Sequence, residues 1–168
     1  MRTACVIVHL VVMMSSFACF SATLSMGQTS ARPGELGVTV PLSIVSAHTD
    51  QISGLQVDIT FNNKTLEVAG ISAGAAAITA KKDVSCSMLS AGVVRLIIAG
   101  LNQNVIPDGV VANLSFNVAT TAPNVPEALT LSHVLAADPV GVAVPISMAS
   151  GSITVLKSTE GEVDDPIA

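Results

Sequence analysis

The side chains that could carry acid–base or nucleophilic chemistry in this chain are few and lie far apart in the sequence. Beyond the N-terminal segment the histidines are His48, in a polar Ala-His-Thr-Asp turn, and His133, in an apolar stretch. Cys86 lies between two serines, with no basic neighbour to activate its thiol. Asp164 and Asp165 are adjacent, whereas glycoside hydrolysis needs two acids held across a cleft. These residues indicate binding or structure rather than catalysis.

The C-terminal residues 157–168 lose the apolar periodicity of the preceding chain and carry four acidic side chains. This composition predicts a solvated, flexible acidic tail. A calcium loop would need several oxygen ligands at fixed spacing around a turn glycine, and the sequence contains no Asp-x-Asp-x-Asp-Gly run. We therefore expect no metal site and no cofactor.

Residues 1–27 have the features of an export signal. A basic second residue is followed by an apolar stretch from Ala4 to Met14, interrupted by one histidine, and then by small residues. This is the order of charged, hydrophobic and cleavage regions in a secretory signal peptide. Small side chains allow cleavage after Ala22 or before Gln28. We expect a secreted protein, extracellular or at the cell surface, that begins near Thr23 or Gln28.

Two alternatives to simple secretion fit the N-terminal segment less well. Cys19 follows a small residue, as the anchoring cysteine of a lipoprotein does. The bulky Phe17 and the polar Ser16, however, match a lipidation signal poorly. An uncleaved anchor would need about 20 apolar residues to cross a bilayer. The apolar stretch is shorter, so we expect no membrane span in the mature chain.

The remaining residues, 28–156, are enough for one domain with an adequate core. Removal of the signal leaves Cys86 as the last cysteine, so no internal disulfide can form and the fold must rest on its core. Without Arg2, six of the seven Lys and Arg remain against twelve Asp and Glu, a net charge of about −6. Nucleic acid is excluded as a partner because phosphate binding needs a basic surface.

Short segments of alternating apolar and polar residues predict an all-β fold. Gly54–Phe61 has apolar odd positions and polar or small even positions, and the same period of two recurs in Val38–Ile44 and Ala112–Val118. Proline and glycine separate the segments. About nine such strands predict an antiparallel β-sandwich. Only Ala73–Lys82, rich in alanine, could form a helix, and a short one.

Aromatic side chains are almost absent. Phe61 and Phe116 are the only rings beyond the signal, and both fall on the apolar side of their strands, so we expect them in the core. Sugar-binding modules usually stack exposed rings on sugars, which weakens the hypothesis of a carbohydrate-binding module. A structural surface protein without a small ligand is another alternative.

Several segments together resemble the cohesin family, over residues 35 to 156. They are Gly37–Pro41, Ile52–Leu66, Ile98–Gly100, Asp108–Phe116 and Gly151–Val155, which follow the order of the family's opening, strand and closing patterns. The sequence departs from the family at one turn, where Phe61-Asn62-Asn63 stands for Tyr-Asp-Pro, as in a distant member. The resemblance implies a nine-stranded jelly-roll sandwich that binds a protein.

Cohesins capture dockerins, helical modules that carry their own calcium, and so assemble polysaccharide-degrading complexes. The resemblance therefore implies a dockerin-like partner, with polysaccharide reached only indirectly. In the family the dockerin lies across one sheet face. The corresponding outward positions here are Gln56, Asp58, Cys86, Met88, Val93, Arg95, Ile97 and Gly100.

The alternation of side chains along the strand that contains Arg95 also predicts that Arg95 and Ile97 point outward. If Val94, Leu96 and Ile98 point into the core, then Arg95 and Ile97 point outward. An apolar side chain beside a charged one suits a protein-binding strip. The alternative is burial, because the continuous apolar run also fits a strand covered on both faces.

Overall fold

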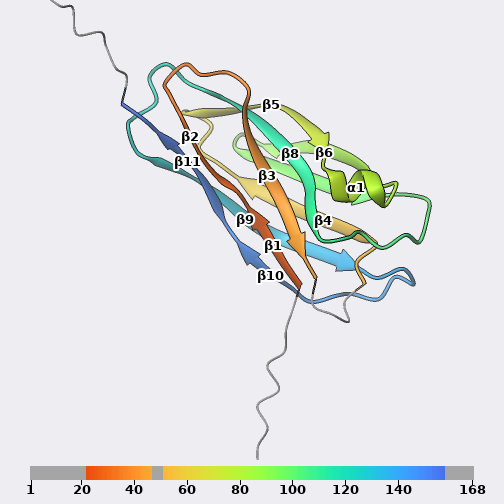
Figure 1. The fold of residues 1–168 in the computed structure, drawn as a ribbon. Coiled ribbons are helices and arrows are strands. Elements are labelled where there is room, and N and C mark those ends of the chain that lie inside the picture. The colour runs from red at the N-terminus through yellow and green to blue at the C-terminus, as the bar shows by residue number, and fades with distance from the viewer. Residues whose placement is uncertain (1–21, 47–50, 158–168) are drawn as a thin grey trace, which may run out of the picture.

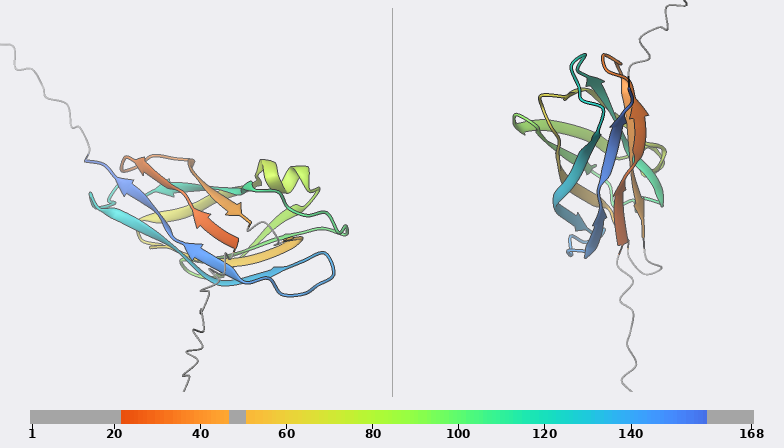
Figure 2. Two further views of the ribbon diagram at one scale, coloured as in Figure 1. Left: turned by 60° about the horizontal axis from the view of Figure 1, so that its bottom comes forward. Right: turned by 90° about the vertical axis from the view of Figure 1, so that its left-hand side faces the viewer.

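Eleven strands and one short helix make up the part of the chain described by the computed structural model, residues 22–46 and 51–157. Most of the predicted signal, His48 and the acidic tail lie outside these residues. The strands form two sheets that pack face to face (Figures 1 and 2). The predicted all-β sandwich is confirmed.

The first sheet has five strands in the order β10-β1-β3-β8-β5, and the second has six in the order β2-β11-β9-β4-β7-β6. The strands are β1 (Ala22–Met26), β2 (Gln28–Ala31), β3 (Val38–Val45), β4 (Gly54–Thr60), β5 (Leu66–Ala73), β6 (Asp83–Ser90), β7 (Val93–Ala99), β8 (Gly109–Val118), β9 (Pro126–Ala137), β10 (Ile146–Ala149) and β11 (Gly151–Val155). The helix α1 (Ala75–Thr79) follows β5, within the predicted alanine-rich segment.

The core forms where the apolar sides of the two sheets meet. In β3 the alternate residues Val38, Val40, Leu42 and Ile44 are all buried, as the period of two predicts. Phe116 in β8 is fully buried, and its ring meets that of Phe61 edge to face with centroids 5.6 Å apart. The predicted inward facing of both rings is confirmed.

The terminal segments pass from one sheet to the other, and the described strands number eleven, against about nine predicted. β1 lies in the first sheet and β2 in the second, with Gly27 between them. β10 and β11 are divided in the same way at Ser150. β1 falls within residues 1–27, which the sequence analysis assigned to the signal, so it was not among the predicted strands.

The two crossovers touch one another, and this contact depends on glycine. The amide of Ser152 donates to the carbonyl of Gly27 at 3.3 Å, and the amide of Gly27 donates to the carbonyl of Pro41 at 2.8 Å. A Cβ atom on Gly151 would overlap the Gly27 carbonyl oxygen, which is backbone and cannot rotate away. No side chain fits at position 151 without a shift of the main chain.

We expect Gly151→Ala to destabilise the domain by about 1–3 kcal/mol or more, as overpacking does. Chemical denaturation monitored by far-UV circular dichroism would measure this loss. Gly70→Ala is the matched control, because a Cβ on Gly70 meets nothing within 4 Å. Equal stability of the two variants would contradict the crossover contact.

We propose that export removes residues up to about Ala22 and leaves residues 23–26 of β1 in the secreted protein. Leu24 and Met26 of β1 are buried, and the strand pairs with both β3 and β10. Cleavage before Gln28 would remove these contacts, so we expect the secreted chain to begin near Thr23. Intact-mass measurement of the secreted form tests this, and retention of Met1 would show that the segment is not cleaved.

Within residues 22–46 and 51–157 no helix is long and apolar enough to cross a membrane.

Candidate protein-binding site

The strand register assembles one outward face on the six-stranded sheet, from β9, β4, β7 and β6. Residues that pair across antiparallel strands point to the same side of a sheet. One row across this face contains Ser132, Asp58, Arg95 and Ser87, and the next contains Leu135, Gln56, Ile97 and Ser85. Thr130, Thr60 and Val93 form a third row. We call these three rows the outward face.

An ion pair occupies the middle of the outward face. Arg95 donates from Nε to Oδ1 of Asp58 at 2.6 Å and from Nη2 to Oδ2 at 2.8 Å. The Asp58 side chain is only 4% exposed, whereas that of Arg95 is 32% exposed, so the guanidinium covers the carboxylate. The hydrogen bonds from Arg95 hold the pKa of Asp58 below its ordinary value of 3.8, against the opposing effect of burial. The two charges neutralise one another.

His133 lies against the same carboxylate from β9. Its Nδ1 is 3.3 Å from Oδ2 of Asp58 and also 3.3 Å from the hydroxyl oxygen of Ser132. A Ser-His-Asp catalytic triad uses the two ring nitrogens separately, one toward the acid and one toward the serine. Here one nitrogen faces both groups and the ring is largely exposed. The arrangement does not have the geometry of a triad.

The backbone at His133 explains how β9 presents its side chains. Gln56 pairs with Leu135 and Asp58 with Ser132, so β9 has one residue more than β4 in this stretch. Such a bulge places one residue in an unusual conformation, and His133 has φ 47°. Beyond the bulge the facing is reversed: Leu129 and Leu131 are buried, but Leu135 is 65% exposed.

The structure thus adds residues to the outward face that the sequence did not indicate. Leu135 is the one apolar addition, and the polar additions are Thr60, Ser85, Ser87, Thr130 and Ser132. In the sequence, Val134 and Leu135 are both apolar, so strict alternation from Leu131 would have placed Leu135 inside. The only local signal of the bulge was His133, a polar residue at a position where alternation from Leu131 predicts an apolar one.

Five of the eight predicted site residues lie together on the outward face. They are Gln56, Asp58, Val93, Arg95 and Ile97. Ile97 is 42% exposed. Of the two interpretations of this strand, exposure on one face rather than burial on both holds in the structure, because the alternate residues Val94, Leu96 and Ile98 are buried.

Cys86 and Met88 do not share this face, which corrects their predicted grouping. They pair with Leu96 and Val94, the inward residues of β7, so their side chains point toward the interior side of the sheet. Both are nevertheless exposed, because β6 is the last strand of its sheet. The outward positions of Cys86 and Met88 came from the family resemblance, whereas the alternation of Val84, Cys86 and Met88 with Ser85 and Ser87 already places the less polar side chains on the inward face.

Gly100 lies at the end of β7, beside a loop rather than on the outward face. A Cβ at this position would come within 3.0 Å of the Lys81 carbonyl oxygen. The neighbouring Lys82 is buried and donates from Nζ to Ser53 Oγ at 3.0 Å and to the Asn102 carbonyl at 2.8 Å. Burial lowers the pKa of Lys82. These contacts hold the loop after β7 and thereby the edge of the site.

The ion pair makes a prediction about stability and pH. The pKa of Asp58 is lower in the folded than in the unfolded chain, so its stabilising effect is present above the ordinary value of 3.8 and is lost as pH falls below it. We expect Arg95→Ala to lower the thermal midpoint at pH 7 and to lower it less at pH 3. Arg95→Lys should lie between, because lysine cannot make the bidentate pair. An equal effect of Arg95→Ala at both pH values would contradict this account.

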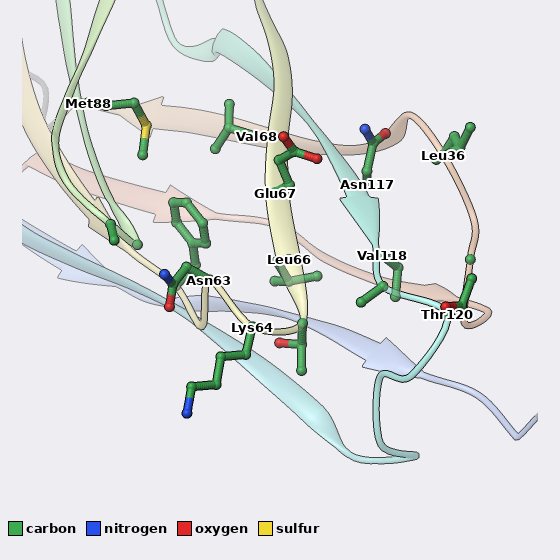
Figure 3. Close-up of a pocket in the computed structure, with 16 residues that line it drawn as sticks. Leu36, Asn63, Lys64, Leu66, Glu67, Val68, Met88, Asn117, Val118 and Thr120 are labelled. Carbon is green, nitrogen blue, oxygen red and sulfur yellow. The ribbon is translucent and has the colours of Figure 1, made fainter.

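A cavity of about 660 Å³ opens at another place, where β5 meets the turn between β6 and β7 (Figure 3). Phe61, Val68 and Met88 contribute apolar lining, and Lys64 and Glu67 contribute charges. Phe61 is only 7% exposed and packs edge-on against Phe116, so its ring is not free to stack on a sugar. No group of three or more His, Cys, Asp or Glu that could hold a metal occurs in the described residues.

Comparisons with known proteins agree on the fold. The family model for the cohesin domain matches residues 22–155. No curated protein sequence matches significantly. Similar solved structures include the sixth cohesin of scaffoldin B from Acetivibrio cellulolyticus in complex with a mutant Cel5 dockerin (20% identity, TM-score 0.72, covering 81% of this chain and 99% of that one).

Two further structures are similar to the same extent. The complex of the OlpA cohesin with dockerin 918 from Clostridium thermocellum has 15% identity and a TM-score of 0.73, over 82% of this chain and 100% of that one. The non-cellulosomal cohesin of the archaeon Archaeoglobus fulgidus has 23% identity and a TM-score of 0.70, over 84% and 95%. With its two-sheet sandwich and a family match across nearly all of its described residues, this chain belongs to the cohesin family.

Proposed function

We propose that this chain is a secreted cohesin that acts by binding, and that it captures a dockerin-type partner on the outward face. The observation that carries the proposal is the exposed apolar pair Ile97 and Leu135, on either side of Gln56, on one sheet face of a cohesin fold. Two of the similar structures are cohesins in complex with dockerins. Calcium would belong to the partner, and polysaccharide would be reached through the enzymes that carry it.

The composition of the outward face suits docking by shape and apolar contact. Ile97 and Leu135 provide an apolar centre, and serine and threonine hydroxyls surround it, which is the usual division into apolar core and polar rim. The charges of Asp58 and Arg95 cancel locally, so long-range steering by this face is weak. We expect the association rate to change little between low and physiological salt, in contrast to interfaces built on unpaired charges.

A direct binding measurement tests the proposal. The secreted chain would be immobilised and exposed to the secreted fraction of the same organism, with and without a calcium chelator. Captured proteins would be identified by mass spectrometry, and any with a dockerin sequence would be purified and titrated calorimetrically. We expect calcium-dependent binding with one partner per cohesin.

Other outcomes would favour the other hypotheses. Retention on insoluble polysaccharide without a protein partner would indicate a carbohydrate-binding module. Failure to bind any dockerin of the organism, together with no retention on polysaccharide, would indicate a structural surface protein.

A further inference from the structure

The strand β6 is an edge that lacks most of the usual protection against pairing. It pairs with β7 on one side, and no described strand pairs with its other side. Exposed edges are generally blunted by lysine, proline or bulges. β6 contains neither lysine nor proline, its one charge is Asp83 at the first position, and its irregularity lies at the far end, between Met88 and Ser90. The regular part of the edge is therefore Val84–Met88.

The inward side of this edge is also open. Cys86 and Met88 point to the interior side of the sheet yet are exposed, and Met88 is 54% exposed. The opposite sheet ends at β5, and the solvent-open cavity of Figure 3 lies between β5 and the Met88 end of β6. The opposite, five-stranded sheet thus leaves an apolar strip on β6 uncovered. A strand added to β6 would bring side chains that cover this strip.

The sequence of β6 is complementary to itself around Cys86. If two copies of the strand pair antiparallel with Cys86 opposite Cys86, then Val84 lies opposite Met88 and Ser85 opposite Ser87. Apolar side chains meet on one side of the sheet and small hydroxyls on the other. Asp83 lies opposite the uncharged Leu89 and not opposite its own copy, so the pairing opposes no like charges.

We propose that β6 pairs with β6 of a second copy of this chain, in antiparallel register centred on Cys86, to form a symmetric dimer with one continuous sheet. The two-fold axis is then perpendicular to the sheet, since both strands lie in one sheet and run in opposite directions. The outward faces of both copies point to the same side. If the proposed function holds, the dimer offers two docking faces side by side, but the pairing itself does not depend on that function.

The first test is sedimentation equilibrium of the secreted chain under reducing conditions, over a wide range of concentration. We expect the mass to rise from monomer toward dimer as concentration increases. The double variant Ser85→Lys/Ser87→Lys places lysine opposite lysine twice and should remain monomeric. Ser85→Lys/Ser87→Asp places lysine opposite aspartate twice and should restore the dimer.

The matched control is Thr39→Lys/Thr60→Lys, which adds the same charges at exposed positions on the non-edge strands β3 and β4. Its dimerisation should equal that of the wild type. The thermal midpoint of every variant shows whether the monomer is folded. If the double lysine variant is misfolded, the single substitution Ser85→Lys replaces it. A monomer at all concentrations, or a dimer that survives both lysine substitutions in a folded variant, would overturn the proposal.

Thiol crosslinking fixes the register independently. Antiparallel partners have Cα atoms about 4.5–5.5 Å apart, within the range that a disulfide spans. With an added oxidant, Cys86 should crosslink to Cys86 rapidly. In the Cys86→Ser background, a mixture of Ser85→Cys and Ser87→Cys chains should form the mixed dimer far faster than either forms its own. Equal rates for all combinations would indicate random collision and contradict this register.

Discussion

Ile97→Asp is expected to weaken capture of the dockerin-type partner by roughly 100-fold or more, as loss of a central apolar anchor does at protein interfaces. Ile97 is exposed at the centre of the outward face, beside Gln56. In the complex, an aspartate at this position would be buried without a partner, and burial of an unpaired charge is costly. Calorimetric titration of the purified partner measures the change in Kd.

Two controls separate a binding effect from a folding effect. Ile98→Asp makes the same chemical change at the next residue, which is fully buried, and should unfold the domain. Val45→Asp makes a comparable change at an exposed position on β3 of the opposite sheet and should leave capture unaltered. If Ile97→Asp is folded and still captures the partner at full strength, the partner binds elsewhere.

Phe116→Ala is expected to lower the free energy of unfolding by about 3–5 kcal/mol, the usual cost of truncating a buried aromatic side chain. Phe116 is fully buried in β8, and its contact with Phe61 adds an edge-to-face ring pair to the packing. Phe61 and Phe116 are the only Phe, Tyr or Trp residues in the described part of the chain, so no other large side chain of this kind can fill the space. Denaturant unfolding with the linear extrapolation measures the loss.

Phe116→Leu is the matched control, because it keeps most of the apolar volume and should cost markedly less. Phe61→Leu should also be mild. A loss of less than about 1 kcal/mol for Phe116→Ala would show that the site collapses around the missing ring, and would contradict a tightly packed core at this position.

The core and the sheet class follow from local sequence, because burial on one face of a strand imposes a period of two. Val38 to Ile44 shows this period plainly, and its facing is as predicted. In Val94 to Ile98 only Arg95 interrupts the apolar run, and the structure selects the interpretation with one exposed face. The pairing of Asp58 with Arg95 also places both on the expected face. Long strands with a buried side therefore constrain both the fold and part of the site.

The rest of the site depends on irregularities that local patterns do not encode. The bulge at His133 turns Leu135 outward, and its backbone conformation is imposed by the pairing of β9 with β4. Leu135 was missed for this reason. Cys86 and Met88 were misplaced because their outward positions were taken from the family resemblance, whereas the alternation within β6 agrees with the facing that its pairing with β7 imposes.

The terminal crossovers have a mechanical consequence. β1 runs parallel to β10, and β2 runs parallel to β11, and the first and last described residues lie at opposite ends of the sandwich (Figure 1). Tension applied to the two ends would therefore slide these strands along one another instead of peeling them apart. All hydrogen bonds of a parallel pair share the load in that geometry, so the fold resists stretching between its two ends better than one whose terminal strands peel away bond by bond.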